Sequence, residues 1–190
     1  MCTDYRPLND ITKKDAHPIP RIDDTLAMLK NGSTVCSELD LTSEYYQMGL
    51  TPRAIERAAF VTPDGHWEYL RMPFGLCNAP VSFQRMMNNI FRDMIGKTLL
   101  VYLDDITVFT RTFKEHLATL EQIFKRLREE GLYLKPKKYT FAADEVAFLG
   151  YIIDKDGLRT NSAKVDSINS YPRLRTRTEI RAFLGLAMYY

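Results

Sequence analysis

The chain has 190 residues, of which 45% are hydrophobic and 26% are charged, and its formal net charge at pH 7 is +2. This length and hydrophobic content suit one well-packed domain with a small appended piece. The mild basic excess is compatible with a nucleic-acid partner but does not require one. The three cysteines and three histidines are scattered, which argues against a disulfide framework and against a zinc site.

The sequence shows no apolar run of membrane-spanning length and no signal peptide. We therefore expect an intracellular, cytoplasmic protein without a membrane partner, with the nucleus as the alternative location. The chain opens without a lead-in and stops inside a run of helical periodicity, so we expect it to be part of a larger protein. The sequence gives no indication of the oligomeric state.

The first part of the chain predicts a helix, a strand and a hairpin. Apolar periodicity at Ile22–Leu29 predicts a short helix that ends at Asn31-Gly32. Thr34–Leu41 predicts a strand. Ala58–Thr62 and His66–Met72 predict the two strands of a hairpin, because a Pro-Asp-Gly turn separates them.

The middle of the chain predicts a helix and a second hairpin. Asn78-Ala79-Pro80 begins the helix, since Asn can cap a helix and Pro is tolerated in its first turn. Leu99–Leu103 and Ile106–Phe109 are apolar strands joined at Asp104-Asp105. The apolar face of the helix is formed by residues at helical spacing, namely Phe83, Met86, Met87, Ile90, Phe91 and Met94.

The last part of the chain predicts one long helix and several short elements. Thr112 and Glu115 have the capping-box pattern at the start of the long helix, and Gly131 ends it. The mixed order of elements favours an α+β fold, with an antiparallel sheet and helices on one of its faces. The remaining predicted elements are strands at Leu132–Leu134, Tyr139–Phe141 and Ala147–Ile153, and helices at Ser162–Tyr171 and from Thr176.

Three carboxylates carry the chemistry that the sequence suggests. Asp104 and Asp105 lie between two apolar strands, where carboxylates are costly without a cation. The alternative is a polar hairpin turn, although such a turn more usually contains Gly. Asp40 ends another apolar strand, and the alternative role for Asp40 is that of a helix N-cap. Taken together the three residues make a magnesium-binding cluster plausible, since hard oxygen ligands suit Mg²⁺.

The order of five motifs identifies a family resemblance. The sequence resembles the reverse transcriptases of gypsy-type (Metaviridae) LTR retrotransposon Pol polyproteins over essentially its whole length. The resemblance implies an RNA-directed DNA polymerase, which adds deoxynucleotides to a primer by two-metal phosphoryl transfer. The motifs that carry it are Asp4–Asn9, Leu39–Ser43, Met72–Pro80, Tyr102–Asp105 and Phe148–Tyr151.

The resemblance also implies a domain organisation. It places partial fingers at residues 1–33 and the palm at residues 34–153. The palm would include a fingers hairpin at residues 54–72 and a primer grip at residues 147–153. Residues 154–190 would begin the thumb or connection.

The resemblance further implies roles for individual residues. Asp40, Asp104 and Asp105 would be the catalytic carboxylates that bind two Mg²⁺ ions, with Mn²⁺ as a substitute. The incoming deoxynucleotide would contact four residues, which are Tyr45, Phe74, Gly75 and Gln84. The template and primer, of RNA or DNA, would contact Arg6, Tyr102, Phe148, Leu149, Gly150 and Tyr151. The rest of the Pol polyprotein would be a further partner.

Two departures from the family pattern suggest an alternative function. The usual Ser-Gly-Tyr-His-Gln is here Ser43-Glu44-Tyr45-Tyr46-Gln47. Glu44 therefore adds a negative charge beside the expected nucleotide pocket or disturbs the turn. The family's triphosphate-binding Lys and Arg come before the Asp4 motif, and by spacing the Arg falls immediately before Met1. The alternative is a truncated or decayed palm that binds nucleic acid without catalysis.

Overall fold

The computed structural model describes residues 3–18, 34–135 and 139–187. The helix predicted at Ile22–Leu29 lies outside these ranges. Within them, no helix combines the length and the apolar content needed to cross a membrane.

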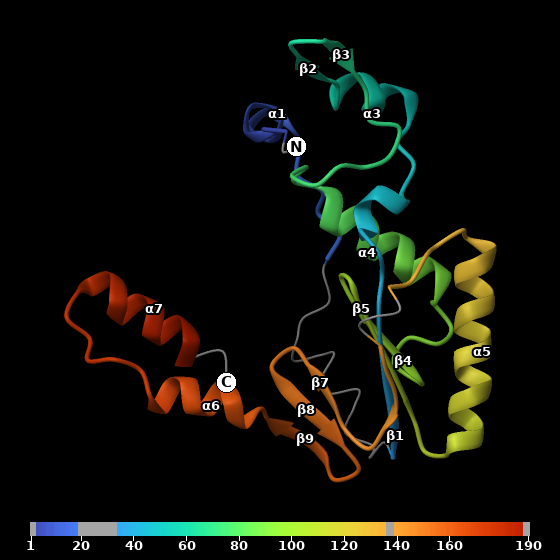
Figure 1. Ribbon diagram of the computed structural model, residues 1–190, viewed down its shortest axis with the longest axis vertical. Coiled ribbons are helices and arrows are strands. Elements are labelled where there is room, and N and C mark those ends of the chain that lie inside the picture. Colours follow the sequence, from blue (N-terminus) through green and yellow to red (C-terminus); the bar gives the residue numbers. More distant parts are fainter. Residues whose placement is uncertain (1–2, 19–33, 136–138, 188–190) are drawn as a thin grey trace.

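A four-stranded antiparallel sheet forms the centre of the fold (Figure 1). Its strands, in spatial order, are β4 (Leu99–Tyr102), β5 (Asp105–Thr110), β1 (Val35–Asp40) and β6 (Thr140–Ala143). The predictions of these four strands are confirmed to within one or two residues. The mixture of this antiparallel sheet with packed helices also confirms the predicted α+β class.

One face of this sheet is covered by helices α4 (Ala79–Ile90) and α5 (Phe113–Glu129). Successive side chains of a strand point to opposite faces, so only alternate residues reach this core. The buried core between the helices and the sheet includes Leu39, Leu41, Phe83, Met87, Phe91, Leu99, Val101, Ile106, Val108, Ile123 and Leu127. The apolar face predicted for α4 is therefore the face that packs on the sheet.

The predicted ends of α5 are confirmed. The Thr112 hydroxyl accepts a hydrogen bond from the backbone N–H of Glu115 at 3.2 Å. Beyond the helix, Gly131 has φ +65°, a left-handed conformation that Gly adopts without steric cost. Helix α5 therefore has the capped start and the Gly stop that its sequence predicts.

The opposite face of the central sheet is covered by a second antiparallel sheet. It consists of β7 (Val146–Phe148), β8 (Tyr151–Asp154) and β9 (Gly157–Thr160). Its buried contacts with the central sheet involve Cys36, Leu100, Phe109, Val146, Phe148 and Ile153. The central sheet is thus sandwiched between helices and a smaller sheet.

Two strand predictions were wrong. The single strand predicted at Ala147–Ile153 is a tight hairpin, because Leu149 and Gly150 have φ +48° and +83° and reverse the chain. Positive φ at both central residues is the requirement of a two-residue hairpin turn of type I′. The strand predicted at Leu132–Leu134 is reduced to one bridge between Leu134 and Leu41.

Two short helices and a hairpin lie above the central sheet (Figure 1). The predicted hairpin is confirmed as β2 (Phe60–Thr62) and β3 (Gly65–Trp67), although its second strand is shorter than predicted. Helices α1 (Arg6–Ile11) and α3 (Pro52–Arg57) were not predicted. The sequence signal for α3 that was missed is Thr51, which comes directly before a Pro at the first helical position. The Thr51 side chain accepts a hydrogen bond from the N–H of Ala54.

Hydrogen bonds from the first residues hold this upper part together. The Tyr5 hydroxyl is buried and donates to the Ala58 carbonyl at 2.8 Å. The Asn9 amide donates to the Gly75 carbonyl at 2.7 Å, and its oxygen accepts from the N–H of Cys77 at 2.8 Å. The loop that precedes α4 is therefore fixed by α1.

Asn78 lies at the N-cap position of α4 as predicted, but its side chain does not cap the helix. Asn78 makes no capping hydrogen bond to its own helix. Its oxygen accepts from the N–H of Asp15 at 3.0 Å, and its amide donates to the Lys13 carbonyl at 3.0 Å. Tertiary contacts with the N-terminal segment replace the local cap that the sequence suggested.

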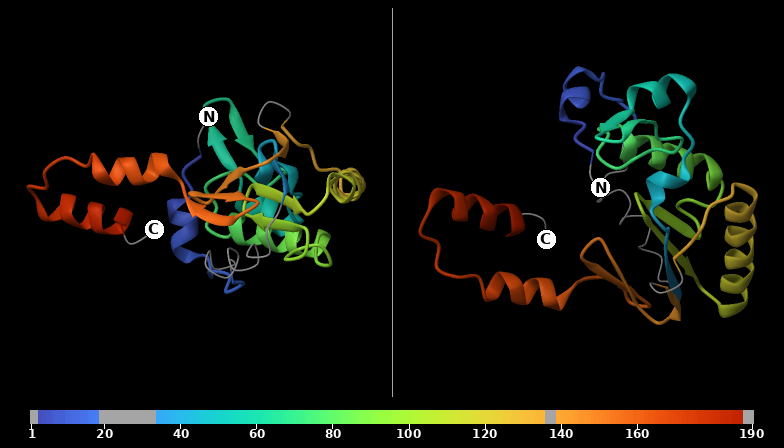
Figure 2. Two further views of the ribbon diagram at one scale, coloured as in Figure 1. Left: turned by 90° about the horizontal axis from the view of Figure 1, so that it is seen from below. Right: turned by 45° about the horizontal axis from the view of Figure 1, so that its top comes forward.

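The last two helices form an arm that extends away from β9 (Figures 1 and 2). They are α6 (Ser162–Asn169) and α7 (Arg177–Ala187), and both were predicted. Thr176 and Glu179 form the predicted capping box: the Glu179 carboxylate accepts from the Thr176 N–H at 3.1 Å, and the Thr176 hydroxyl accepts from the Glu179 N–H at 3.2 Å. Tyr171 and Phe183 make an edge contact that joins the two helices.

A buried histidine connects α5 to the central sheet. His116 is fully buried, with Nε2 2.6 Å from the Ser37 hydroxyl oxygen and Nδ1 2.9 Å from the Thr110 hydroxyl oxygen. Ser37 in turn accepts from the N–H of Ala142 in β6 at 2.9 Å. Burial lowers the pKa of His116, because the charged imidazolium loses hydration.

We expect acid to destabilise the fold through His116. The His116 side chain of the unfolded chain takes up a proton near pH 6.5, whereas that of the folded protein does so only at lower pH. The free energy of unfolding therefore falls as the pH drops below about 6.5, by up to about 1.4 kcal/mol for each pH unit. Urea unfolding between pH 7 and 5 measures this. His116→Gln should remove this component of the slope, and the exposed control His66→Gln should keep it. Equal slopes in both variants would contradict the assignment.

Candidate active site

The pairing of β1 with β5 places two of the three predicted carboxylates side by side. Asp40 and Asp105 are direct partners in the antiparallel ladder, and Tyr102 is the partner of Asp105 on the other side. Side chains of direct partners lie on the same face with Cβ atoms about 5 Å apart. Asp104 follows in the turn between β4 and β5. The structure therefore places Asp40 next to Asp105, with Asp104 in the adjoining turn.

The turn that carries Asp104 is held from below by Gln84 of α4. Leu103, in this turn, has φ +52°, which is unfavourable for a residue with a side chain. Its N–H donates to the Gln84 side-chain oxygen at 2.7 Å, and the Gln84 amide donates to the Val101 carbonyl at 3.1 Å. Gln84 thus binds the backbone of β4 and of the turn that follows it, and these contacts offset part of the strain in the turn.

The position of Gln84 differs from the one expected by resemblance. The side chain was predicted to contact the incoming nucleotide, but it is fully buried, and its amide also donates to Asn88 at 2.9 Å. In this structure Gln84 therefore acts on the site through the backbone of the turn. The predicted nucleotide contact stays a prediction.

A short 3₁₀ helix, η1 (Glu44–Gln47), brings a fourth carboxylate to the site. It follows Ser43, whose φ of +46° turns the chain sharply after β1. Glu44 is only 9% exposed, and its negative charge is among the causes that raise the pKa of Asp104. The departure from the family pattern noted in the sequence therefore lies at the carboxylate cluster itself.

The environment of Asp104 favours its protonated form. Burial raises the pKa of Asp104 to about 6, and the negative charges of Glu44, Asp105 and Asp40 add to this effect. Burial also raises the pKa of Tyr45 to about 12, with Asp104 and Glu44 contributing. Both shifts show that negative charge is concentrated at this end of the sheet.

The same environment fits a divalent cation. Asp104 Oδ1 is buried and has no hydrogen-bond partner among the described residues. Within those residues, no three Asp, Glu, His or Cys side chains converge closely enough to enclose a metal ion by themselves. An open set of oxygen ligands suits Mg²⁺, which usually binds one or two carboxylates and completes its shell with water and substrate phosphates. Asp40, Asp104 and Asp105 stay the predicted ligands of such a cation.

Gln47 fixes the η1 turn to the segment that follows α5. Its side-chain oxygen accepts from the N–H of Tyr133 at 2.6 Å, and its amide donates to the Tyr133 carbonyl at 2.9 Å. Sequence reasoning assigned no role to Gln47, because its partner is far along the chain. These contacts restrict the positions of Glu44 and Tyr45, which lie on the same turn.

Aromatic rings line the space above the carboxylates. The Tyr45 ring lies 4.9 Å from that of Phe74 and 5.9 Å from that of Phe83, measured between ring centroids. Tyr46 packs edge-on against Phe74 at 5.4 Å. Phe74 remains 45% exposed, so its ring presents an apolar surface to solvent. The structure therefore groups the predicted nucleotide residues Tyr45 and Phe74.

Gly75 is required by the local structure. Its φ is +96°, and a Cβ atom there would lie 3.4 Å from Cδ2 of Tyr5. Any other residue would therefore strain the backbone and crowd the Tyr5 ring. The predicted contact of Gly75 with the incoming nucleotide stays a prediction.

Four of the six residues predicted to contact nucleic acid lie on the same side of the central sheet as Asp40 and Asp105. Tyr102, Phe148, Leu149 and Tyr151 all belong to the cluster that joins the two sheets. Gly150 lies in the hairpin turn between Leu149 and Tyr151. Arg6 is separate: it lies in α1, its side chain is 87% exposed, and it pairs with Asp4 at 2.6 Å.

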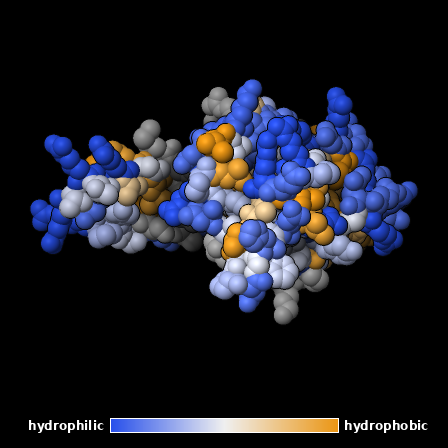
Figure 3. Space-filling model, turned by 90° about the horizontal axis from the view of Figure 1, so that it is seen from above, coloured by the Kyte–Doolittle hydropathy of each residue, from blue (hydrophilic) through white to orange (hydrophobic). Residues whose placement is uncertain are grey.

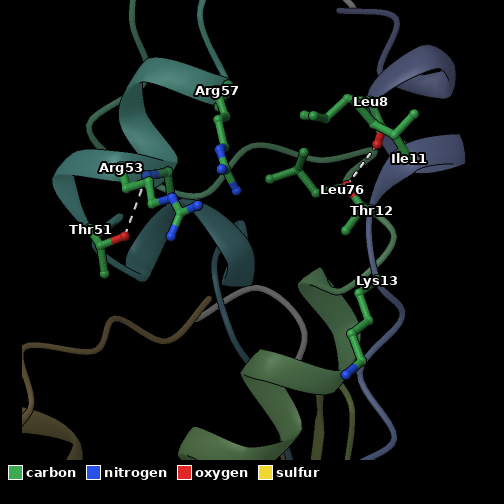
Figure 4. Close-up of a pocket in the computed structure, with 10 residues that line it drawn as sticks. Leu8, Ile11, Thr12, Lys13, Thr51, Arg53, Arg57 and Leu76 are labelled. Atoms are coloured by element: carbon green, nitrogen blue, oxygen red, sulfur yellow. Dashed lines mark hydrogen bonds between the residues drawn. The ribbon is translucent and has the colours of Figure 1, made fainter.

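A cavity of about 670 Å³ opens between α1 and α3, away from the carboxylates (Figure 4). Leu8, Ile11 and Leu76 border one side of it, and Arg53 and Arg57 border the other (Figure 4). Viewed from this end, the surface has small hydrophobic patches among hydrophilic residues (Figure 3). The exposed large hydrophobic residues of this region are Ile11, Val61, Trp67 and Leu70.

An antiparallel sheet with acidic residues at the end of a hairpin and helices behind it has the architecture of a polymerase palm. A family model described as "Reverse transcriptase (RNA-dependent DNA polymerase)" matches residues 1–153. The chain therefore belongs to the reverse transcriptase family, whose members use divalent metal ions.

Transposon polyproteins of Drosophila melanogaster are among its relatives. The chain is 46% identical over 187 residues to the retrovirus-related Pol polyprotein from transposon 297, covering 98% of this chain and 18% of the relative. It is 36% identical over 190 residues to that from transposon gypsy, covering 100% of this chain and 18% of the relative. These relatives confirm the gypsy-type resemblance, and the chain spans less than a fifth of their length.

The fold is shared with a solved viral enzyme. The foamy viral protease-reverse transcriptase, solved in complex with an RNA/DNA hybrid, superimposes with a TM-score of 0.83 at 29% sequence identity. The match covers 96% of this chain and 25% of the viral chain. The architecture of sheet, helices and hairpins described above is therefore that of a reverse transcriptase.

We expect Gln84→Leu to destabilise the fold by about 1 to 3 kcal/mol, because the partly buried N–H of Leu103 loses its acceptor. Urea unfolding measures the loss. The control Gln122→Leu makes the same change at an exposed position of α5 and should alter stability by about 0.5 kcal/mol or less. Equal losses in the two variants would refute the role of Gln84 in supporting the turn.

We expect Asp104→Asn to stabilise the metal-free protein at neutral pH. The pKa of Asp104 is raised to about 6, so the folded state binds a proton at Asp104 more tightly than the unfolded chain does. The free energy of unfolding therefore falls as the pH rises from about 4 to about 6. Partial exposure reduces the effect, so we expect a gain of about 1 kcal/mol above that window and almost none below it.

Urea unfolding in EDTA at about pH 7.5 and about pH 4 measures this difference. The exposed control Asp10→Asn should show no such dependence on pH. A gain that is equal at both pH values would show that packing, and not charge, is responsible.

Proposed function

We propose that this chain is the core of an RNA-directed DNA polymerase, which extends a primer with deoxynucleotides. The single observation that carries the proposal is the register of β1 and β5, which sets Asp40 opposite Asp105 beside the Asp104 turn. Membership of the reverse transcriptase family supports it. The activity of the longer protein, of which the relatives are examples, is part of the same proposal.

In this proposal the carboxylates hold two Mg²⁺ ions, with Mn²⁺ as a substitute. Asp40 and Asp104 would contact both ions, and Asp105 would support one. Two such ions would supply activation of the attacking oxygen and stabilisation of the leaving group in a phosphoryl displacement. The protein's own contribution is to position negative charge, which the Asp40–Asp105 pairing and the Gln84 contacts do.

The incoming deoxynucleotide would bind against Tyr45 and Phe74. Their rings pack on one another, and Phe74 leaves an apolar face exposed. A Tyr45 ring beside the sugar would clash with a 2′-hydroxyl, and this would favour deoxynucleotides. Gly75 would allow close approach of the nucleotide or template, and Gln84 would support the turn beneath it.

The template and primer would lie on the side of the central sheet that carries Tyr102 and the Phe148–Tyr151 hairpin. The foamy viral relative was solved with an RNA/DNA hybrid, which supports a similar partner here. Arg6 would support the template from α1, and we add Arg53 and Arg57 as cations of the cavity between α1 and α3. Contacts of cations with phosphates would make binding weaken with rising salt. The remaining regions of a Pol polyprotein would be further partners.

The second candidate function is nucleic-acid binding without catalysis. One observation favours it: Glu44 is buried, and its negative charge raises the pKa of Asp104, one of the carboxylates that the reaction needs. A reverse transcriptase fold would still offer the same surface to nucleic acid. A direct assay separates the two functions.

We expect primer extension on poly-rA with oligo-dT, dTTP and Mg²⁺. Asp104→Asn should reduce the rate by about a hundredfold or more, because it removes a charge that positions the metal ions. EDTA should abolish extension, and Mn²⁺ should restore part of it. The control Asp10→Asn carries the same substitution in α1 and should extend at the parental rate.

Extension that survives Asp104→Asn would contradict the proposed role of the carboxylates. Absence of extension together with tight binding of the primer–template, measured by fluorescence anisotropy, would favour the second candidate function.

A further inference from the structure

The turn that carries Tyr45 is weakly stabilised by its own hydrogen bonds. It is a 3₁₀ helix of four residues, and hydrogen bonds in such helices have poor geometry. Ser43 precedes it with φ +46° and makes no side-chain capping hydrogen bond within the described part of the chain. Inside the turn, the N–H of Tyr46 donates to the Ser43 carbonyl at 2.9 Å, and that of Met48 donates to the Tyr45 carbonyl at 3.0 Å. The position of Tyr45 therefore depends on contacts between η1 and other segments.

Gln47 connects η1 to two other segments through its side-chain amide. The oxygen accepts from the N–H of Tyr133 at 2.6 Å, and the nitrogen donates to the Tyr133 carbonyl at 2.9 Å and to the Thr42 carbonyl at 2.5 Å. The side chain thus pairs with the Tyr133 backbone as a peptide group of a neighbouring strand would. This pairing needs a donor and an acceptor on the same group, which an amide has and a carboxylate lacks.

The segment that Gln47 contacts also holds the end of β1. The N–H of Thr42 donates to the Tyr133 carbonyl at 3.0 Å, and the N–H of Lys135 donates to the Asp40 carbonyl at 2.8 Å. Residues 133–135 therefore lie beside the end of the strand that carries Asp40. Through Gln47, η1 is tied to the same segment as that strand.

A third connection joins η1 to the loop before α4. The Arg71 guanidinium donates to the Gln47 backbone carbonyl at 2.7 Å. Farther along this loop, the Phe74 ring lies 4.9 Å from the Tyr45 ring. Gln47 therefore lies where η1, the segment after α5 and the loop before α4 meet, two positions beyond Tyr45.

We propose that Gln47 is a positioning residue for selection of the sugar, whose hydrogen bonds hold the Tyr45 ring where it excludes a 2′-hydroxyl. The inference rests on the proposed polymerase function, in which Tyr45 contacts the sugar of the incoming nucleotide. Gln47 does not contact the nucleotide itself and acts through the backbone of η1. Because a misplacement of about 1 Å can change a rate by roughly a hundredfold, a small movement of η1 is enough to weaken the exclusion.

The test measures discrimination between sugars during primer extension. On poly-rA with oligo-dT, kcat/KM is measured for dTTP and for the ribonucleotide with the same base, 5-methyluridine triphosphate, and their ratio reports the effect of the 2′-hydroxyl. Gln47→Glu keeps the size of the side chain but turns an oxygen toward the carbonyls of Thr42 and Tyr133. Gln47→Met keeps the length and cannot donate a hydrogen bond. Gln122→Glu, at an exposed position of α5, is the matched control.

We expect both Gln47 variants to lower the ratio by about tenfold, as fits the loss of one or two hydrogen bonds. Gln122→Glu should discriminate as the parent does. Tyr45→Ala should also lower the ratio, and Gln47→Glu added to Tyr45→Ala should lower it no further, because Gln47 acts through Tyr45. If Gln47→Glu does not fold, Gln47→Met takes its place, alone and combined with Tyr45→Ala.

Four results would overturn the inference while the parent extends the primer. They are an unchanged ratio in the Gln47 variants, an equal loss of kcat/KM for both nucleotides, a ratio that Tyr45→Ala leaves unchanged, and a further loss when the two substitutions are combined. Each of these keeps the polymerase function. Absence of extension by the parent would reject the polymerase function and the role of Gln47 with it.

Discussion

The register between β1 and β5 is the constraint on which the rest of the site depends. Asp40 faces Asp105 only because Leu39 faces Ile106, and both apolar side chains are buried beneath α4 and α5. A slip of one residue would move every side chain of a strand to the opposite face. It would place carboxylates in the core, where unpaired charge is costly. Hydrophobic burial on one face thus fixes the chemistry on the other.

The concentration of negative charge is maintained at a cost in stability. The raised pKa of Asp104 shows that its ionised form is disfavoured by burial and by three neighbouring carboxylates. Gln84 offsets part of the strain in the turn by binding the backbone of Leu103 within it and of Val101 just before it. A site that is destabilised without its cation is suited to bind one, because the cation relieves the same repulsion.

The loop before α4 connects the carboxylates to the upper part of the fold. Asn9 binds the loop at Gly75 and Cys77, and Asn78 binds the backbone of Lys13 and Asp15. Phe74 is thereby held against Tyr45 and Tyr46, above the carboxylates. These contacts join residues more than sixty positions apart, so the aromatic surface exists only when the first segment is folded onto the loop.

The sequence by itself predicted most of the local elements and singled out three carboxylates as candidate catalytic residues. The period of the apolar residues predicted β1, β4, β5, α4 and α5, because burial on one face imposes that period. The motif order predicted the reverse transcriptase family. What only the tertiary structure decided were the contacts between distant segments. They include the partners of Asn78 and the buried position of Gln84, neither of which leaves a periodic signal in the chain.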